Sequence, residues 1–371
     1  MLLVAVVVTA LVFDFTNGFH DTANSMATSI ATGALRPKVA VGLSAVLNLV
    51  GAFLSVEVAK TISGGLVDDA RIGPAVIFAG LIGAITWNLI TWYVGLPSSS
   101  SHALFGGLIG ATWIAAGSDA VNFGKIVQKI LVPAVAAPLI AGLVAAVATY
   151  LTYRLVARIG KRKAATGFRW GQVVSASAVS LAHGTNDAQK TMGVITLTLI
   201  SVGYLPNGAP PPTWVIVSAA VAIALGTYFG GWRIIHTMGK GLTELEGPQG
   251  FAAQTSSATV ILAASQLGLP LSTTHACSGG IVGSGLGRRD ASVRWGLAAR
   301  MVAGWFMTLP SAAVIGAAAG KVASFGNAGV VVVAVIGMAI AGVLWVFSRR
   351  GDKHPHRVVE DLAGEPERTK I

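Results

Sequence analysis

The chain has 371 residues, of which 53% are hydrophobic and 11% are charged, and it carries a net charge of +11. Soluble domains carry roughly 25% charged residues. This composition therefore excludes an ordinary soluble enzyme and a disordered chain, and it leaves a polytopic membrane protein. Because a spanning helix needs about 20 apolar residues, the length allows on the order of ten crossings.

Apolar runs follow one another along almost the whole chain, which predicts an all-α fold. In chain order they cover 1–34, 39–62, 72–95, 102–117, 131–156, 170–202, 214–238, 251–267, 276–287, 295–320 and 328–348. Glycine and polar residues interrupt the long runs 1–34 and 170–202, which favours broken helices. Runs 102–117 and 276–287 are short and follow a proline and a hydroxyl cluster. Such segments at matching positions are typical of a transporter binding site.

Basic residues gather in short clusters between the apolar runs rather than on one face of a soluble domain. This pattern excludes nucleic acid as a partner and follows the positive-inside rule for membrane proteins. It places the basic linkers 35–38 and 157–169 in the cytoplasm, and the uncharged linker 203–213 outside. We therefore expect a multi-pass protein of the plasma (inner) membrane, with an external N-terminus and a polar cytoplasmic tail at 349–371.

Two sequence signatures occur twice, in the same order. Residues 95–107 read GLPSSSSHALFGG and residues 268–280 read GLPLSTTHACSGG, which are identical at eight of thirteen positions. Residues 18–26 and 184–192 share the first Gly, the Asp at the fourth position and the final Met. A chance likeness between apolar helices does not produce two ordered matches of this kind.

The repeat and the charge pattern together predict two halves of opposite orientation. The first long run passes from outside to inside and the second passes from inside to outside. We expect an inverted repeat at 1–156 with a re-entrant hairpin at 95–117, and a second at 170–348 with a hairpin at 268–287. The basic linker 157–169 joins them. Inverted repeats place a transport site at their interface, near the bilayer midplane.

Asp21 and Asp187 occupy matched positions in the two halves. A charge inside a membrane segment costs at least about 2.5–3.5 kcal/mol on insertion scales, and it tends to mark a pathway or a site. The glycine before each Asp permits an unwound turn that could hold a cation; the alternative is that each Asp only caps a broken helix. Asp14, whose counterpart Ser180 is uncharged, is as consistent with a structural role as with a functional one.

Hydroxyl residues follow the proline in each hairpin. A helix that starts there offers free N–H groups and the positive end of its dipole, which together form an anion site. Two such starts could hold one tetrahedral oxyanion; the alternative is ordinary helix capping. The hydroxyl residues are Ser99, Ser100, Ser101, Ser272, Thr273 and Thr274.

Lys190 breaks the symmetry of the repeat, because its counterpart is Asn24. It could attract an anion, replace a cation beside Asp187, or form a structural pair with Asp187 at i, i+3. The histidines of the signatures are open to proton coupling or to structural hydrogen bonding, and they lack a compact metal-ligand spacing. The single cysteine, Cys277, excludes internal disulfides and a cysteine metal site. No cofactor and no resident metal are predicted.

These motifs resemble the paired signatures of the inorganic phosphate transporter (Pit) family. The resemblance rests on residues 14–25, DFTNGFHDTANS, on residues 183–193, HGTNDAQKTMG, on residues 226–238 and on the two Gly-Leu-Pro segments, and it extends over roughly 10–350. It implies an α-helical secondary symporter with inverted repeats and re-entrant hairpins, and not an enzyme. Carried onto this chain, it implies that Asp21, Asn24, Asn186 and Asp187 are the signature polar positions and that the hairpin hydroxyls face the anion. We assign the coupling cation to those four residues, and we add Gln189 and Lys190 to the hydroxyls as the expected anion ligands.

Two departures from the family pattern bear on coupling. His20 stands where the family core has Asn, and Gln189-Lys190 stands where sodium-coupled members carry a small residue and Asn. Gln-Lys is similar to the bacterial low-affinity branch, which the resemblance implies is driven by protons and takes up phosphate partly as a neutral metal complex. We therefore expect proton-driven uptake of inorganic phosphate, alone or as a metal–phosphate complex.

The alternatives are sodium coupling, and proton-coupled transport of sulfate or another tetrahedral oxyanion. A passive channel is disfavoured by the deep Asp pair. An intramembrane hydrolase is disfavoured because adjacent residues such as Ser101 and His102 do not face each other on a helix. The expected partners are phosphate, the coupling cation and the lipid bilayer, and the sequence leaves open whether the chain forms a homo-oligomer.

Overall fold

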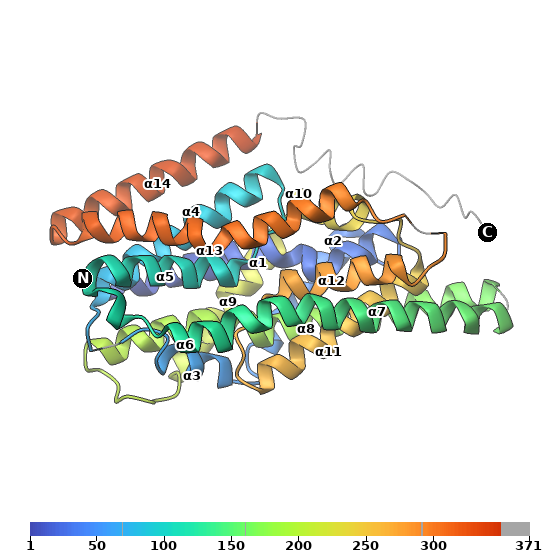
Figure 1. Ribbon diagram of the computed structural model, residues 1–371, viewed down its shortest axis with the longest axis horizontal. Coiled ribbons are helices and arrows are strands. Elements are labelled where there is room, and N and C mark those ends of the chain that lie inside the picture. Colours follow the sequence, from blue (N-terminus) through green and yellow to red (C-terminus); the bar gives the residue numbers. More distant parts are fainter. Residues whose placement is uncertain (69, 160, 291, 350–371) are drawn as a thin grey trace.

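The computed structural model describes residues 1–68, 70–159, 161–290 and 292–349. Its regular secondary structure is helical, apart from two isolated antiparallel bridges, Val67–Val121 and Thr243–Val293, so the all-α prediction is confirmed (Figure 1). The elements are α1 (Leu2–Ala31), α2 (Pro37–Gly51), α3 (Glu57–Ser63), α4 (Pro74–Val94), α5 (Ser100–Ala116), η1 (Ser118–Ala120), α6 (Phe123–Ile126), η2 (Val127–Leu131), α7 (Val132–Ile159), α8 (Lys161–Ser201), α9 (Thr213–Phe229), α10 (Trp232–His236), η3 (Thr237–Gly241), α11 (Gly247–Gln266), α12 (Thr273–Leu286), α13 (Trp295–Ala323) and α14 (Asn327–Arg349).

Large apolar side chains lie on the surface and charged side chains lie in the interior, which is the reverse of a soluble protein. Phe306, Val314 and Leu139 are 71%, 70% and 67% exposed, while Asp187 and Lys190 are 0% exposed. In water such an apolar surface would drive association, whereas lipid is its natural solvent. The chain is therefore a multi-pass membrane protein whose polar groups are turned inward.

Within the described residues, five helices are long and apolar enough to cross a membrane, and a sixth crossing results if the bent pair α9–α10 with η3 counts as one. This number is smaller than the ten or so crossings that the length allows. The reason is that α5 and α12 have only 17 and 14 residues. In addition, α8 has 41 residues but a mean hydropathy lowered by its polar side chains.

Two helical hairpins meet tip to tip. The first joins α4 to α5 through residues 95–99, and the second joins α11 to α12 through residues 267–272. The Ser101 hydroxyl donates to the Leu271 carbonyl at 3.1 Å, and the rings of His102 and His275 are 4.8 Å apart. From this meeting point α5 and α12 extend toward opposite ends of the molecule (Figure 1).

The prediction of broken helices at 1–34 and 170–202 is wrong in its location, because α1 and α8 are continuous there. The glycines serve close packing instead of unwinding. A Cβ on Gly18 would collide with the Ile223 carbonyl of α9, and one on Gly184 would collide with the Asn48 carbonyl of α2. The break lies between α9 and α10, which are bent by 63°.

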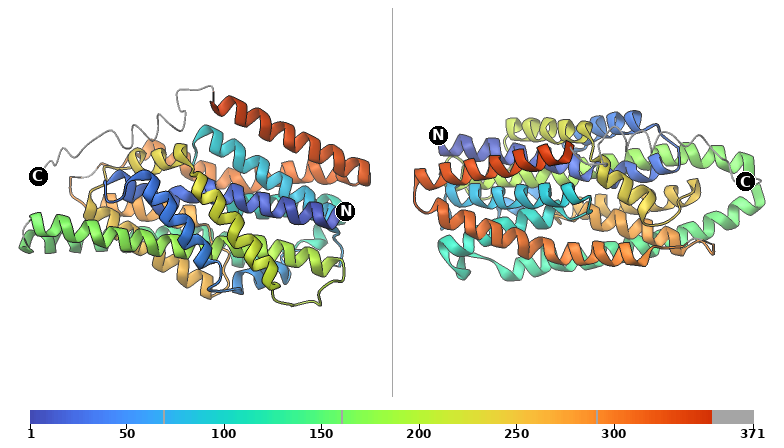
Figure 2. Two further views of the ribbon diagram at one scale, coloured as in Figure 1. Left: turned by 180° about the vertical axis from the view of Figure 1, so that it is seen from behind. Right: turned by 90° about the horizontal axis from the view of Figure 1, so that it is seen from above.

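Helices from the first half of the chain pack against helices from the second half. Helix α1 packs on α9 and α8 packs on α2, while α5 packs on α13 and α12 packs on α7. Each hairpin helix is thus held by a long helix from the other half. The expected linker 157–169 falls at the facing ends of α7 and α8, which project together from the bundle (Figures 1 and 2). Apart from Arg349, the expected tail 349–371 lies outside the described residues.

Candidate functional site

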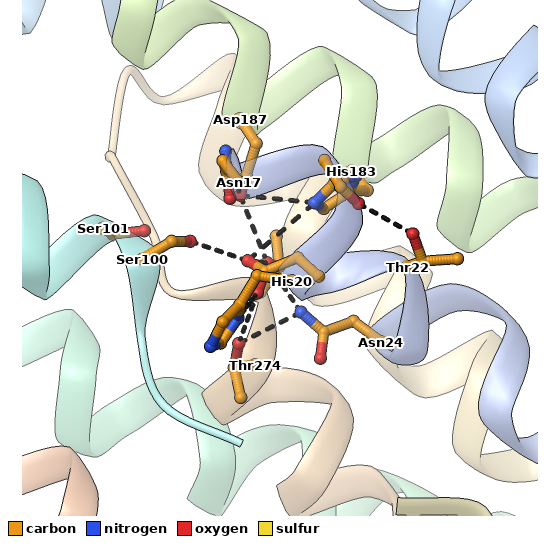
Figure 3. Close-up of polar contacts among 12 residues, drawn as sticks. Asn17, His20, Thr22, Asn24, Ser100, Ser101, His183, Asp187 and Thr274 are labelled. Atoms are coloured by element: carbon orange, nitrogen blue, oxygen red, sulfur yellow. Dashed lines mark hydrogen bonds and ion pairs between the residues drawn. The ribbon is translucent and has the colours of Figure 1, made fainter. Parts of the chain in front are cut away.

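Two polar stripes face each other where α1 and α8 pack in the middle of the molecule. On α1, Asp14, Asn17, Asp21 and Asn24 follow at intervals of three or four residues, which places them on one face of the helix. On α8, His183, Asp187 and Lys190 follow the same rule. The hairpin tips close over these stripes from the side (Figure 3).

Asp187 has the fuller set of partners of the two carboxylates. Its Oδ1 accepts from the Lys190 ammonium at 2.6 Å. Its Oδ2 lies 3.4 Å from Nε2 of His183 and accepts from the Asn17 amide at 3.3 Å. Both members of the ion pair are completely buried. A buried charge is tolerated only when it is paired and hydrogen-bonded, and Asp187 meets that condition.

Asp21 lies at the meeting point of the hairpin tips. Its Oδ2 accepts from the Ser100 hydroxyl at 2.7 Å, and its Oδ1 is 2.7 Å from Nδ1 of His20. The Thr273 hydroxyl lies 3.4 Å from Oδ2 of Asp21 and also 3.4 Å from Oδ2 of Asp187. One threonine from α12 thus bridges the two carboxylates that the repeat had paired.

Hydroxyls from both hairpins reach the cluster. Lys190 donates to the Ser101 hydroxyl at 2.6 Å, and the Asn24 amide donates to the hydroxyls of Thr273 and Thr274 at 3.2 and 3.1 Å. The first turns of α5 and α12 leave backbone N–H groups free of intrahelical partners. Helix starts, hydroxyls and one ammonium therefore face two carboxylates at a single buried position.

Three of the predicted site residues lie at its edge. Ser99 and Ser272 are the N-caps of α5 and α12, and they accept from the backbone N–H groups of His102 and His275. Asn186 donates to the Ser265 hydroxyl at 2.9 Å and to the Leu269 carbonyl at 3.2 Å, which fixes the second hairpin turn.

Gln189 points away from the cluster. Its side-chain oxygen accepts from the backbone N–H groups of Val58 and Ala59 at 2.8 and 3.2 Å, at the start of α3. Its amide nitrogen donates to the Thr185 carbonyl, one turn earlier on its own helix. The structure therefore does not bring Gln189 together with the other expected anion ligands.

His20, His183 and Asn17 belong to the cluster although the sequence did not assign them to it. His183 lies 4.0 Å from Oδ2 of Asp21 and also contacts Asp187, while its other ring nitrogen is 3.2 Å from the Asn48 side-chain oxygen. The spacing of His183 and Asp187 at i, i+4 was the available signal. This spacing is weak evidence by itself, because it shows that two residues share one face of a helix but not which residues of other helices lie opposite them.

A compact set of metal-ligating atoms results from the packing of α1 on α8. One carboxylate oxygen each of Asp21 and Asp187 and a ring nitrogen of His183 all lie within 4.8 Å of one another, and all three residues are buried. Carboxylate oxygen and imidazole nitrogen suit divalent cations such as Zn²⁺ and Mn²⁺. The fold thus supplies the compact ligand spacing that the dispersed histidines lack in the sequence.

An all-helical polytopic fold that closes two hairpin tips over buried ionisable residues defines a membrane transporter. Residues 17–316 match the phosphate transporter family, and the chain belongs to that family. This membership confirms both the resemblance and the prediction that the chain is a transporter rather than an enzyme.

Relatives of known description support the same assignment. The chain is 56% identical to the probable low-affinity inorganic phosphate transporter of Mycobacterium bovis, over 98% of this chain and 88% of the relative. Proteins with the same description from Rhizobium meliloti and Bacillus subtilis are 47% and 44% identical, over 85% and 86% of this chain and 95% and 96% of their own lengths. A solved structure described as the sodium-dependent phosphate transporter has the same fold, with a TM-score of 0.78 at 24% identity over 87% of this chain and 99% of that one.

Proposed function

We propose that this protein is a secondary active symporter that takes up inorganic phosphate across the plasma membrane with the proton gradient as its driving force. The observation that carries the proposal is the junction of the two hairpin tips with Asp21, Asp187 and Lys190. Ser100, Ser101 and Lys190 lie on one side of this junction, and Thr273 and Thr274 lie on the other. The descriptions of the relatives, which name inorganic phosphate, support the choice of anion.

The anion in this proposal binds between the starts of α5 and α12. Free N–H groups and helix dipoles favour negative charge there, and the hydroxyls and Lys190 add donors. Asp21 supplies an acceptor beside those donors. Hydrogen phosphate carries an O–H group that can donate to a carboxylate, whereas sulfate carries none, so an acceptor in the anion shell favours phosphate over sulfate.

Transport then requires the site to open to each side in turn. Every side chain of the cluster is 5% exposed or less, so the described conformation is closed. We propose that 1–156 and 170–348 are inverted repeats, that α4–α5 and α11–α12 are re-entrant hairpins, and that the repeats rock around the fixed site. In the proposed orientation the N-terminus is outside, and the 157–169 segment and the tail are cytoplasmic.

The Lys190–Asp187 pair supports proton coupling over sodium coupling. The ammonium lies 2.6 Å from the carboxylate that would have to ligate a sodium ion. Two positive charges this close repel strongly where the dielectric is low. Sodium coupling is the second candidate, because the related solved structure is described as sodium-dependent.

A divalent metal could enter together with phosphate. The ligand set of Asp21, His183 and Asp187 lies next to the proposed anion position. A metal bound to phosphate would contact these residues while the phosphate oxygens contact the hairpin hydroxyls and Lys190, and the charge of the phosphate would offset the repulsion that a lone sodium ion would meet from Lys190. In this reading the metal is cargo and not a resident cofactor.

The test is uptake of labelled phosphate into proteoliposomes under an imposed pH gradient, an imposed sodium gradient, or neither. We expect accumulation with the pH gradient alone, resistance to excess sulfate, and stimulation by a divalent cation if the complex is carried. Accumulation with sodium alone would contradict proton coupling. Loss of uptake in excess sulfate would contradict the choice of phosphate.

Variants locate the site in the same assay. Asp187→Asn and Lys190→Ala should each abolish accumulation, with the amount of inserted protein measured alongside. Lys60→Ala, which removes the exposed ion pair with Glu57 at the same i, i+3 spacing, is the matched control and should transport normally. Normal uptake by both site variants would place the site elsewhere.

A further inference from the structure

Asp14 is a buried acid that the proposed site does not use. It lies on the same face of α1 as Asp21, two turns nearer the N-terminus, and its side chain is 0% exposed. Neither of its carboxyl oxygens has a hydrogen-bond partner among the described residues. An ionised carboxylate without donors is costly away from water, and the neutral, protonated form avoids that cost.

Further unpartnered polar atoms connect Asp14 to the site. The Thr191 hydroxyl of α8, which lies near Asp14, is buried without a hydrogen-bond partner in the described structure. Asn17, one turn along α1, donates its amide to Asp187 at 3.3 Å and keeps its own oxygen unpartnered. The polar stripe therefore continues from the carboxylate pair to Asp14, where it ends among apolar side chains such as Phe13 and Ala10.

The charges that reach Asp14 come from α8. They are Asp187, which accepts from Asn17 one turn along α1 from Asp14, and Lys190, which is paired with Asp187. A neighbouring negative charge favours a protonated carboxyl group, and a neighbouring positive charge favours an ionised one. Helices α4 and α9 pack along this part of α1 and contain no Asp, Glu, Lys, Arg or His within their described bounds; their ionisable side chains are Tyr93 and Tyr228.

The other helices that touch α1 do so closer to its C-terminal end. Such contacts lie at Phe19 for Gly231 at the start of α10, at Asp21 for α5, at Asn24 and Ser25 for α12, α2 and α11, and at Ala27 for η3. The ionisable groups beside those contacts, including His20 and His183, surround Asp21 rather than Asp14. The protonation of Asp14 is therefore governed by the Asp187–Lys190 pair.

We propose that Asp14 is the residue that carries the coupling proton. When an anion binds Lys190, it neutralises the positive field that favours an ionised Asp14, and Asp14 takes up a proton from the side to which the site is open. When the anion leaves on the other side, the field of Lys190 returns and the proton is released. Proton and anion are thereby obliged to cross together. This inference rests on the proposed function and adds the identity of the proton site.

The test separates anion exchange from net transport. Exchange of labelled phosphate at equal pH on both sides needs no net proton movement, whereas accumulation under a pH gradient does. The variants are Asp14→Asn, Asp14→Glu, and Thr28→Val as a control at another buried, unpartnered position of α1. Proton entry is followed with a pH-sensitive dye inside the proteoliposomes.

We expect Asp14→Asn to exchange phosphate like the wild type but to lose both accumulation and proton entry, while Asp14→Glu and Thr28→Val keep all three activities. Accumulation and proton entry by Asp14→Asn at wild-type level would overturn the proposal. Loss of exchange together with accumulation in both Asp14 variants would also overturn it, because Asp14 would then be needed for binding or folding.

Two further outcomes concern the ion itself. Accumulation driven by sodium alone and lost in Asp14→Asn would make Asp14 a sodium ligand, which also contradicts the proposal. A wild-type protein that exchanges no phosphate at all would instead contradict the proposed function. The wild-type measurements thus test the function, and the Asp14 variants test the proton site.

Discussion

Lys190 and Lys60 form ion pairs of the same spacing in opposite surroundings. Lys190 lies 2.6 Å from Asp187 with both side chains completely buried, and Lys60 lies 2.7 Å from Glu57 with the two side chains 45% and 49% exposed. Exposed pairs contribute little because water screens both charges. A buried pair is not a strong source of stability either, but the removal of one partner leaves an uncompensated charge.

The first prediction concerns the stability of these two pairs. Lys190→Ala should lower the free energy of unfolding by about 3–5 kcal/mol, and Lys60→Ala by at most about 1 kcal/mol. The double variant Asp187→Asn with Lys190→Ala should lose less than Lys190→Ala alone, since it removes the orphaned charge. Thermal unfolding in detergent ranks the variants by stability. Equal losses of stability for Lys190→Ala and Lys60→Ala would contradict the argument that burial makes the difference.

The second prediction separates two neighbouring serines. Ser100 donates to Asp21 at the anion-facing junction, whereas Ser99 caps α5. Ser100→Ala should raise the KM for phosphate about tenfold, which corresponds to about 1.4 kcal/mol for a hydrogen bond to a charged group. Ser99→Ala should leave KM unchanged and cost about 1 kcal/mol of stability through the lost cap. Uptake kinetics measure KM and thermal unfolding measures stability. A raised KM in Ser99→Ala with an unchanged KM in Ser100→Ala would contradict the assigned roles.

The packing of α1 on α9 and of α8 on α2 determines how the carboxylates meet. Gly18 and Gly184 let backbones approach where any side chain would collide. Small residues at helix contacts are the usual means of close packing in membranes. The continuous α1 and α8 then carry Asp21 and Asp187 on facing sides, and the bend of 63° falls between α9 and α10.

The third prediction tests this packing with two glycines of helix interiors. Gly18→Ala places a methyl group against the backbone of α9 and should destabilise the protein by about 1–3 kcal/mol. Gly42 of α2 has nothing within 4 Å of an added Cβ. Gly42→Ala should therefore be neutral or stabilising by up to about 1 kcal/mol. Comparable losses for both would show that helix propensity, and not close approach, explains the glycines.

Some elements could be predicted from sequence and others could not. The two hairpins and the paired Asp residues follow from the repeated signatures. The continuity of α1 and α8 does not follow from them, because a glycine next to a polar residue reads equally as an unwound turn and as a packing contact. Similarly, Gln189 reads as an anion ligand beside Lys190, but one residue along a helix turns the side chain by about 100°, here toward the start of α3.

At the scale of the whole molecule, α5 packs on α13 and α12 packs on α7, so each hairpin is held by a helix from the other half of the chain. If the two halves of the chain move relative to each other, both tips should therefore move. The cluster itself could be anticipated only in part, because His183 and Asn17 join it through helix register and not through a motif. Thr273 contacts Asp21 and Asp187, which are distant from it in the sequence. Only the repeated signatures indicated that these segments meet.

The fourth prediction concerns orientation in the membrane. Asn207 lies exposed in the segment between α8 and α9, and Gly167 lies exposed near the start of α8. In whole cells, a membrane-impermeant maleimide should label Asn207→Cys but not Gly167→Cys, which should react only after permeabilisation. The native Cys277 is buried and supplies a low background. The opposite pattern would invert the proposed topology.

The most direct test of the central claim is a structure of the protein with phosphate bound. We predict one anion between the starts of α5 and α12, within hydrogen-bond distance of Ser100 or Ser101 on one side and Thr273 or Thr274 on the other, with Lys190 turned toward it from Asp187. An anion bound away from both hairpin tips, with the Lys190–Asp187 pair unchanged, would contradict the account.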